Sequence, residues 1–230
     1  MNELIAASAS TGAVISLLAY FFGMYLKKKT GWNFMNPLLI SIILVILFLL
    51  VFHVDYSSYN TSARYISWFL TPATVSLAIP LYQQLDRLKA NWKAILVSIF
   101  AGCIASMGSV FALAILFGFN HQQYVTFLPK SITTAIGMGV VEEMGGITPI
   151  TVAVIIVTGI FGNIIGEALC KALKITDPVA VGLALGTSAH AIGTAKAMEL
   201  GETEGAMSSL AIVTAGIITV VCANFFAMLL

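Results

Sequence analysis

Charged residues are scarce in this chain, and their scarcity indicates its class. Only 9% of the 230 residues are Asp, Glu, Lys or Arg, whereas soluble domains carry about 25%. Hydrophobic residues make up 59% of the chain, and the mean hydropathy is +0.99. A helix needs about 20 apolar residues to cross the hydrocarbon core, so the length allows roughly seven or eight crossings. We therefore predict an all-α polytopic membrane protein with one transmembrane domain over residues 1–230.

The sequence also has few cysteines and lacks catalytic motifs. Cys103, Cys170 and Cys222 are far apart and each lies within an apolar run, which is typical of buried free thiols rather than disulfides or metal sites. The motifs HExxH and GxSxG and clusters of Cys and His do not occur. A net charge of +1 gives no indication of nucleic-acid binding. We expect no enzymatic activity, no cofactor, no metal and no nucleic-acid partner.

Hydrophobic segments alternate with short polar stretches along the chain. The segments cover residues 4–26, 37–54, 64–85, 94–119, 127–146, 147–173, 177–200 and 206–230. Polar loops are predicted at 55–61, 120–124 and 201–205. The first segment leads directly into Lys27, Lys28 and Lys29 without a cleavage signal. We expect it to be a membrane helix that places these lysines in the cytoplasm.

Three of the segments contain helix-interrupting residues. Pro72 and Pro80 lie within 64–85, and each proline removes a helical hydrogen bond. Segment 127–146 is short and rich in glycine, and we interpret it as a broken helix or a re-entrant hairpin. A re-entrant segment would place the lysines that end segment 147–173 in the cytoplasm, in agreement with the positive-inside tendency.

Segment 177–200 is the most polar of these apolar stretches. It contains three glycines together with His190, Lys196 and Glu199. Ionisable groups at bilayer depth cost about 2.5–3.5 kcal/mol each, so a lipid-facing helix would not keep them. The segment indicates a broken helix that lines a polar cavity. The alternative is a continuous, tightly packed helix from which Lys196 extends to the surface.

Two of the interrupted segments resemble each other. Residues 69–80 align with residues 127–137 with one gap, and Ala191–Gly193 follows about one period later. Repeat-like units are therefore expected around 64–85, 127–146 and 177–200. Paired interrupted segments indicate a transporter site near the bilayer midplane. Chance similarity among membrane segments rich in Ala, Ile and Thr would give the same alignment.

The polar residues of these segments suit a small anion. Cations, hydroxyls and free amide N–H groups at helix N-termini all bind carboxylates. The substrate-binding candidates are Pro72, Thr74, Lys130, Ser131, Thr133, Thr134, Asn163, Gly186, Ser188, His190, Gly193, Thr194 and Lys196. Candidates for proton coupling are His190, which can titrate near neutral pH, and Glu142 and Glu167. A structural hydrogen bond would explain His190 equally well, and Glu142 would equally suit a solvated surface.

Four stretches of the chain together resemble the LrgB/CidB family. They read FLTPATVSLAIPLYQQ, LPKSITTAIGMGV, TGIFGNIIGEAL and DPVAVGLALGTSAHAIGTAKAMELGETEGAMSSLAI. The resemblance covers nearly the whole chain, and the run GTSAHAIGTAKA is highly specific. It implies a multi-pass protein of the bacterial inner membrane with a holin-like partner subunit of the LrgA/CidA type. The candidates within these motifs include Ser131, Thr133, Thr134, His190, Thr194 and Lys196.

The resemblance implies two kinds of function. Family members have been described as antiholin-like regulators of murein hydrolase activity and cell lysis. Related systems import pyruvate in bacteria, and a plastid homologue moves glycolate and glycerate. Because the interrupted segments contain costly polar groups, which a carrier needs and a holin-like component does not, we predict a transporter of small monocarboxylates such as pyruvate, glycolate or lactate. The alternative is a lysis regulator, and the small-residue helices also predict homo-oligomers.

Overall fold

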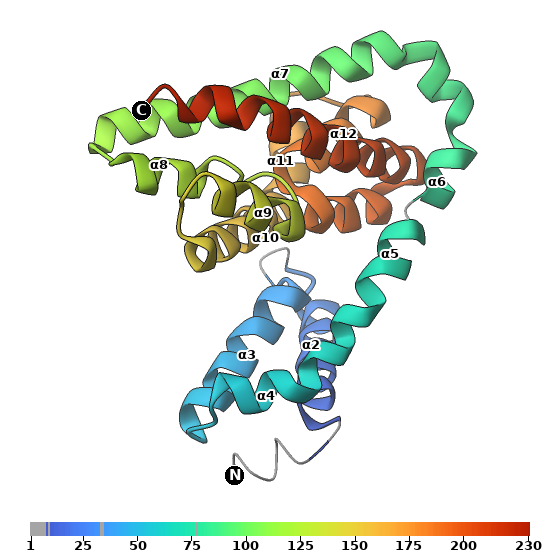
Figure 1. Ribbon diagram of the computed structural model, residues 1–230. Helices are drawn as coiled ribbons and strands as arrows, with labels where there is room; N and C mark the ends of the chain where they lie inside the picture. Colours follow the sequence, from blue (N-terminus) through green and yellow to red (C-terminus); the bar gives the residue numbers. More distant parts are fainter. Residues whose placement is uncertain (1–7, 9, 33–34, 77) are drawn as a thin grey trace. The chain divides into compact units, whose positions relative to one another are not determined.

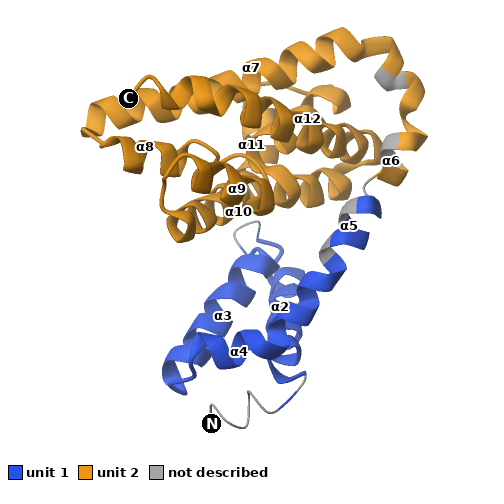
Figure 2. Ribbon diagram, in the orientation of Figure 1, with its two compact units in different colours: residues 1–76 blue, residues 77–230 orange. Residues whose placement is uncertain are grey.

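Every regular element among the described residues is a helix (Figure 1). The computed structural model describes residues 8, 10–32, 35–76 and 78–230. Cα packing divides the chain into two compact units, residues 1–76 and 77–230 (Figure 2). The prediction of an all-α membrane protein is confirmed at this level. Within the described residues, three helices are long and apolar enough to cross a bilayer, over Lys89–Phe117, Thr148–Ala172 and Glu202–Ala227. The larger predicted number of crossings stays a prediction.

Unit 1 is built around two apolar helices. Its elements are α2 (Thr11–Thr30), α3 (Pro37–Val51), α4 (Tyr56–Ala63), the 3-10 helix η1 (Arg64–Phe69) and α5 (Leu70–Ser76). The side chain of Asn36 accepts hydrogen bonds from the amides of Leu38 and Leu39 and so caps α3. Gly12 and Gly23 let α2 approach α4 and α3 closely, because a Cβ at either position would overlap backbone atoms of the neighbouring element.

Unit 2 contains the remaining helices. They are α6 (Ala78–Gln83), α7 (Leu85–Phe117), α8 (His121–Phe127), α9 (Thr134–Glu143), α10 (Thr148–Ala172), α11 (Pro178–Leu200) and α12 (Glu202–Ala227). Buried side chains of α7, α8, α11 and α12 form its main core, which includes Met107, Tyr124, Leu183 and Met207. The Tyr124 hydroxyl donates a hydrogen bond of 2.8 Å to the carbonyl of Phe226 and so joins α8 to the end of α12.

The three predicted polar loops are largely helical, and this part of the prediction is wrong. Residues 55–61 fall mostly in α4, 120–124 mostly in α8, and 201–205 mostly in α12. In the second and third of these stretches, polar side chains stabilise the start of a helix. Asn120 and Gln123 form a reciprocal capping box at the start of α8, and two glutamates lie in the first turn of α12, where the helix dipole favours negative charge.

Helix α11 reverses direction at Ala189 and His190. The backbone angles at these residues are φ −126°, ψ 15° and φ 42°, ψ −138°, outside the helical region. A Cβ on Gly193 would touch the carbonyl oxygen of Leu185, although these residues would lie about 12 Å apart in a straight helix. The interruption predicted for 177–200 is therefore present as a helical hairpin. We name it hairpin 2, with a first arm over 178–188 and a second arm over 191–200.

Helix α10 supports both arms of hairpin 2. The first arm runs antiparallel to α10, because Leu185 lies opposite Gly166 and Ala189 opposite Gly162. The second arm runs parallel to α10. Asn163 donates to the carbonyl of Ile192, and one turn later in both helices Glu167 forms an ion pair with Lys196. The tip of the hairpin therefore lies near the middle of α10. Figure 1 shows α10, α11 and α12 side by side in unit 2.

A second reversal separates α8 from α9. The Thr151 hydroxyl of α10 donates to the carbonyl of Thr126 near the end of α8, and Gly137 of α9 lies against the side chain of Ile155. Helix α9 has 10 residues, which span about 15 Å, roughly half of a hydrocarbon core. We name residues 121–143 hairpin 1 and its non-helical tip residues 128–133. It extends along α10 from the amino end of that helix.

Each hairpin follows a long helix in the chain, and the two helix–hairpin pairs run in opposite directions. Gly102 of α7 lies beside Thr187 of the first arm of hairpin 2, and α7 runs parallel to that arm and antiparallel to α10. Residues 85–143 and 148–200 therefore each form a long helix followed by a hairpin, with inverted orientation. This arrangement includes two of the three predicted repeat-like units, 127–146 and 177–200. The third, 64–85, comprises η1, α5 and α6, and the repeat relation among all three units stays a prediction.

Candidate functional site

The tips of the two hairpins border one cavity of about 470 Å³. Helix α7 forms one wall, α10 another, and the first arm of hairpin 2 a third. The lining residues are Ser98, Gly102, Ser106, Lys130, Ser131, Thr158, Ala180, Leu183, Ala184, Thr187 and Ser188. A volume of this size lies in the range of pockets for small molecules. Small and hydroxyl-bearing side chains predominate in this lining.

Lys130 is the charged residue of this lining. Its ammonium group lies 3.1 Å from the Ser106 hydroxyl of α7 and 3.1 Å from the hydroxyl of the neighbouring Ser131. The two hydroxyl oxygens are 3.0 Å apart, so the three groups form a triangle. Among the ion pairs of the described residues, none includes Lys130. In the part of the chain that the structure describes, the groups that contact the cation are therefore neutral hydroxyls.

Two threonines add free hydroxyls to the cavity. Thr187 is only 8% exposed, and Thr158 lies on the opposite wall on α10. Neither hydroxyl has a hydrogen-bond partner among the described residues, whereas the hydroxyl of Ser188 donates to the carbonyl of Ala184. Hydroxyls both donate and accept hydrogen bonds, so these two can bind polar atoms of a ligand.

A smaller cavity of about 230 Å³ adjoins the first. Both are lined by Ser98, Ala180 and Leu183. The smaller one extends to Asn91 near the start of α7 and to Asp177 at the start of α11. The space around Lys130 therefore continues toward the end of unit 2 at which α7 and hairpin 2 begin.

His190 lies at the tip of hairpin 2 and packs against α10. The residue is 4% exposed, and its Nε2 lies 3.0 Å from the carbonyl oxygen of Ile155. A carbonyl only accepts hydrogen bonds, so Nε2 carries the hydrogen of this contact. Gly159 makes room for the ring, since a Cβ there would lie 2.7 Å from it. His190 thus fixes the reversal of the chain to the middle of α10.

Other predicted site residues also hold hairpin 2 in place and do not line the cavity. Thr194 donates to the carbonyl of His190 and shares a hydrogen bond of 2.7 Å with the Ser208 hydroxyl of α12. Gly186 lies against the backbone of Ser208, and Gly193 against that of Leu185. With the bond from Asn163 to Ile192, these contacts join both arms to α10 and α12.

Lys196 and Glu167 are brought together away from the cavity. Lys196 lies 2.8 Å from one oxygen of Glu167, and Lys171 lies 2.6 Å from the other. Glu199 is a further neighbour of Lys196, at 3.7 Å. The lysine side chains differ in exposure, 15% for Lys196 and 74% for Lys171. One carboxylate therefore links the second arm of hairpin 2 to α10 through a partly buried ion pair.

The difference in exposure predicts two different coupling energies for one carboxylate. In double-mutant cycles with Glu167→Gln, we expect the pair with Lys196→Met to show a coupling of about 1–3 kcal/mol. The pair with Lys171→Met should show less than about 1 kcal/mol, because water screens an exposed lysine. Denaturant unfolding in lipid–detergent micelles measures both. Equal coupling energies would contradict a structural role for the Lys196 pair.

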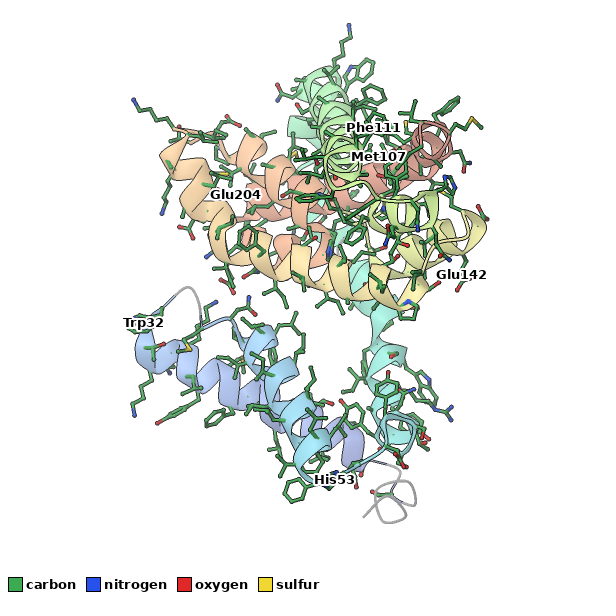
Figure 3. The ribbon with its side chains drawn as sticks, turned by 90° about the vertical axis from the view of Figure 1, so that its left-hand side faces the viewer. Trp32, His53, Met107, Phe111, Glu142 and Glu204 are labelled. Atoms are coloured by element: carbon green, nitrogen blue, oxygen red, sulfur yellow. The ribbon has the colours of Figure 1, made fainter. Side chains whose placement is uncertain are left out.

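The remaining predicted residues have separate positions. Thr133 and Thr134 begin α9, and Glu142 is exposed near the end of that helix (Figure 3). Pro72 lies in α5 of unit 1, and the side chain of Thr74 lies outside the described part of the chain. Of the substrate-binding candidates, the cavity lining brings together Lys130, Ser131 and Ser188.

Sequence reasoning missed four hydroxyl-bearing lining residues and one lining glycine. They are Ser98, Gly102, Ser106, Thr158 and Thr187. Small residues on 94–119 were a visible signal, but in membrane helices such residues usually mark helix packing. Gly102 serves that purpose as well, since it lies against Thr187.

Comparison with known proteins identifies the family. The model of the LrgB-like family matches residues 16–229, which extends through both units. The chain belongs to the LrgB-like family. Proteins named antiholin-like protein LrgB from Bacillus cereus (strain B4264) and Bacillus anthracis (strain A0248) are each 40% identical to it over 216 residues, 94% of either chain. The resemblance predicted from the motifs is thereby confirmed. No solved structure matches the chain.

Proposed function

We propose that this LrgB-like protein is a carrier of small carboxylate anions across the bacterial inner membrane. The observation that carries the proposal is the cavity in which Lys130 faces hydroxyls at the meeting point of two inverted hairpins. Transporter sites are commonly built where interrupted helices of inverted repeats meet near the bilayer midplane. A lone cation without a protein carboxylate attracts an anion and rejects a cation.

The cavity suits a molecule of a few carbon atoms. Lys130 provides the charge that a carboxylate requires, and Ser106 and Ser131 can rotate their hydroxyls to donate to the same oxygens. The free hydroxyls of Thr158 and Thr187 then remain for a second polar group of the substrate. Pyruvate, glycolate and lactate each combine a carboxylate with one such oxygen.

The distribution of lysines supports an orientation for unit 2. Lys89 and Lys93 lie near the start of α7, and Lys171 and Lys174 lie at and just after the end of α10. Because α7 and α10 are antiparallel, all four lysines lie at the same end of the unit. We place this end in the cytoplasm, in line with the positive-inside rule. The smaller cavity then connects the site to the cytoplasm, and hairpin 1 enters from the outside.

The names of the Bacillus relatives support a second candidate function, that of an antiholin-like regulator of cell lysis. Such a protein would act by oligomerisation or by modulating a pore, together with a holin-like LrgA/CidA-type subunit. A regulator of this kind needs packing surfaces but no lysine in a cavity between its helices. We therefore prefer the carrier, for which an altered carboxylate flux would account for a lysis phenotype. We keep the holin-like subunit and self-association as proposed interactions.

Uptake into proteoliposomes tests the carrier against the regulator. We expect saturable uptake of labelled pyruvate, glycolate or lactate, without leakage of an enclosed dye. Ser106→Leu should abolish uptake because the larger side chain fills the cavity beside Lys130. Ser109→Leu, one turn further along α7 and outside the lining, should keep uptake within about two-fold. Dye leakage without saturable uptake would refute the carrier, as would equal effects of the two variants.

A further inference from the structure

We propose that Lys130 itself carries the proton that accompanies the substrate. In this scheme the lysine is protonated while the carboxylate is bound and loses its proton where the anion leaves. One carboxylate and one proton cross the membrane together, so the complex that moves has no added charge. The inference rests on the proposed carrier function and assigns its coupling group.

The surroundings of Lys130 carry this inference. Its nitrogen contacts two hydroxyls, those of Ser106 and Ser131, each at 3.1 Å. By contrast, Lys171 and Lys196 lie within 2.6 Å and 2.8 Å of the Glu167 carboxylate. Lys130 is partly buried, and an ammonium group withdrawn from water is more stable beside an anion than without one. The bound substrate is therefore the counterion of Lys130.

Among the described residues, no titratable side chain near the cavity provides that counterion. The described titratable side chains on helices α7 to α12 of unit 2 are Asp86, Lys89, Lys93 and Cys103 on α7, His121 and Tyr124 on α8, Glu142 and Glu143 on α9, Glu167, Cys170 and Lys171 on α10, His190, Lys196 and Glu199 on α11, and Glu202, Glu204 and Cys222 on α12. None of them forms a hydrogen bond or an ion pair with Lys130 among the described contacts. Asp177, which lines the smaller cavity, accepts a hydrogen bond from the Ala180 amide.

The two serines suit a lysine that changes its protonation state. A hydroxyl can accept a hydrogen bond from an ammonium group and can donate one to the lone pair of a neutral amine. Because Ser106 and Ser131 also contact each other at 3.0 Å, rotation of their hydroxyl hydrogens keeps all three groups bonded in either state. The smaller cavity provides the path by which a proton from water reaches the amine.

The two alternative proton carriers, His190 and Glu167, have other hydrogen-bond or ion-pair partners. The Nε2–H of His190 donates to the Ile155 carbonyl, and protonation of the ring would place an uncompensated charge at the hairpin tip. Glu167 is neutralised by Lys196 and Lys171 and does not line the larger cavity. Lys130 is the titratable group that meets both the substrate and the path to water.

Replacing Lys130 by residues that can and cannot lose a proton tests the proposal. Arginine stays protonated under all ordinary conditions, whereas histidine titrates near neutral pH. In proteoliposomes, a pH difference of one unit, alkaline inside, should drive about tenfold accumulation of labelled pyruvate by the wild-type protein. Lys130→Arg should still exchange labelled for unlabelled pyruvate but should not accumulate it. Lys130→His should accumulate it only at more acidic pH.

Further results of these assays test whether Lys130 carries the coupled proton. Glu142→Gln, at an exposed site on α9, should behave as the wild type in both assays. Accumulation by Lys130→Arg equal to wild type would overturn the proposal, as would wild-type accumulation driven by membrane potential instead of the pH difference. If Lys130→Arg shows neither exchange nor accumulation, the Lys130→His variant and the membrane-potential experiment on the wild type still test whether Lys130 carries the proton. Saturable exchange that ignores the pH difference refutes only the coupling role, whereas absence of any saturable exchange refutes the carrier function.

Discussion

Lys130→Ala is expected to lower the uptake of labelled pyruvate by about 100-fold or more while leaving the amount of protein in the membrane unchanged. The substitution removes the cation of the cavity and with it two hydrogen bonds to the serine hydroxyls. Charge-assisted contacts with a carboxylate in a poorly solvated site contribute about 3 kcal/mol, which corresponds to this factor. Initial uptake rates in proteoliposomes with quantified protein content measure the effect.

Lys171→Ala is the matched control for this prediction. Lys171 is also a lysine of unit 2, but its side chain is 74% exposed and pairs with Glu167 outside the larger cavity. Its loss should change uptake by less than about three-fold, because an exposed ion pair contributes little. If both alanine variants lowered uptake to the same extent, the effect would reflect net charge, and the assignment of Lys130 to the substrate would fail.

Gly193→Val is expected to prevent hairpin 2 from closing. A Cβ at this position would touch the carbonyl oxygen of Leu185 and would lie 2.7 Å from the Cβ of Ala189. Neither neighbour is the flexible end of a long side chain, so the two arms must separate. We expect a loss of at least about 3 kcal/mol in the free energy of unfolding, together with loss of transport. Denaturant unfolding and the yield of monodisperse protein in detergent report the change.

Gly108→Val provides the comparison for a helical glycine without close neighbours. No heavy atom lies within 4 Å of a Cβ built on Gly108, which is part of α7. The same side chain should therefore be tolerated there, with a change of less than about 1 kcal/mol. A Gly193→Val protein as stable as Gly108→Val, with normal uptake, would show that the arms of α11 do not fold back in the membrane.

The sequence was informative where a residue conflicts with its membrane environment. Lys130, the glycines of 177–200 and His190 all conflict with a lipid-facing helix, and each has a defined role in the structure. Helix class, the interruption of α11 and the position of Lys130 beside hydroxyls could therefore be predicted. A costly polar group reveals that it needs a partner, since an unpaired one is unfavourable in an apolar medium.

The identity of that partner could not be predicted in the same way. His190, Asn163 and Thr194 are predicted substrate contacts, with a structural hydrogen bond as the equal alternative for His190. In the structure they bond to the carbonyls of Ile155, Ile192 and His190 and to the Ser208 hydroxyl. Conversely, Ser106 and Thr187 resemble ordinary small residues of packed helices. Which face of a helix borders a cavity depends on how neighbouring helices are rotated, and residues distant in sequence determine that rotation.

The short arms of hairpin 2 have a consequence for biosynthesis. With about 15 Å per arm, neither arm can be inserted as a membrane-spanning helix by the translocation machinery. Gly182 and Gly186 pack against the backbone of α12, which is synthesised after the hairpin. The hairpin thus lacks the part of its supporting surface that α12 provides until α12 has entered the bilayer. A ribosome-released chain that ends at Leu200 would expose unpacked polar arms, and we expect cellular quality control to degrade it rapidly.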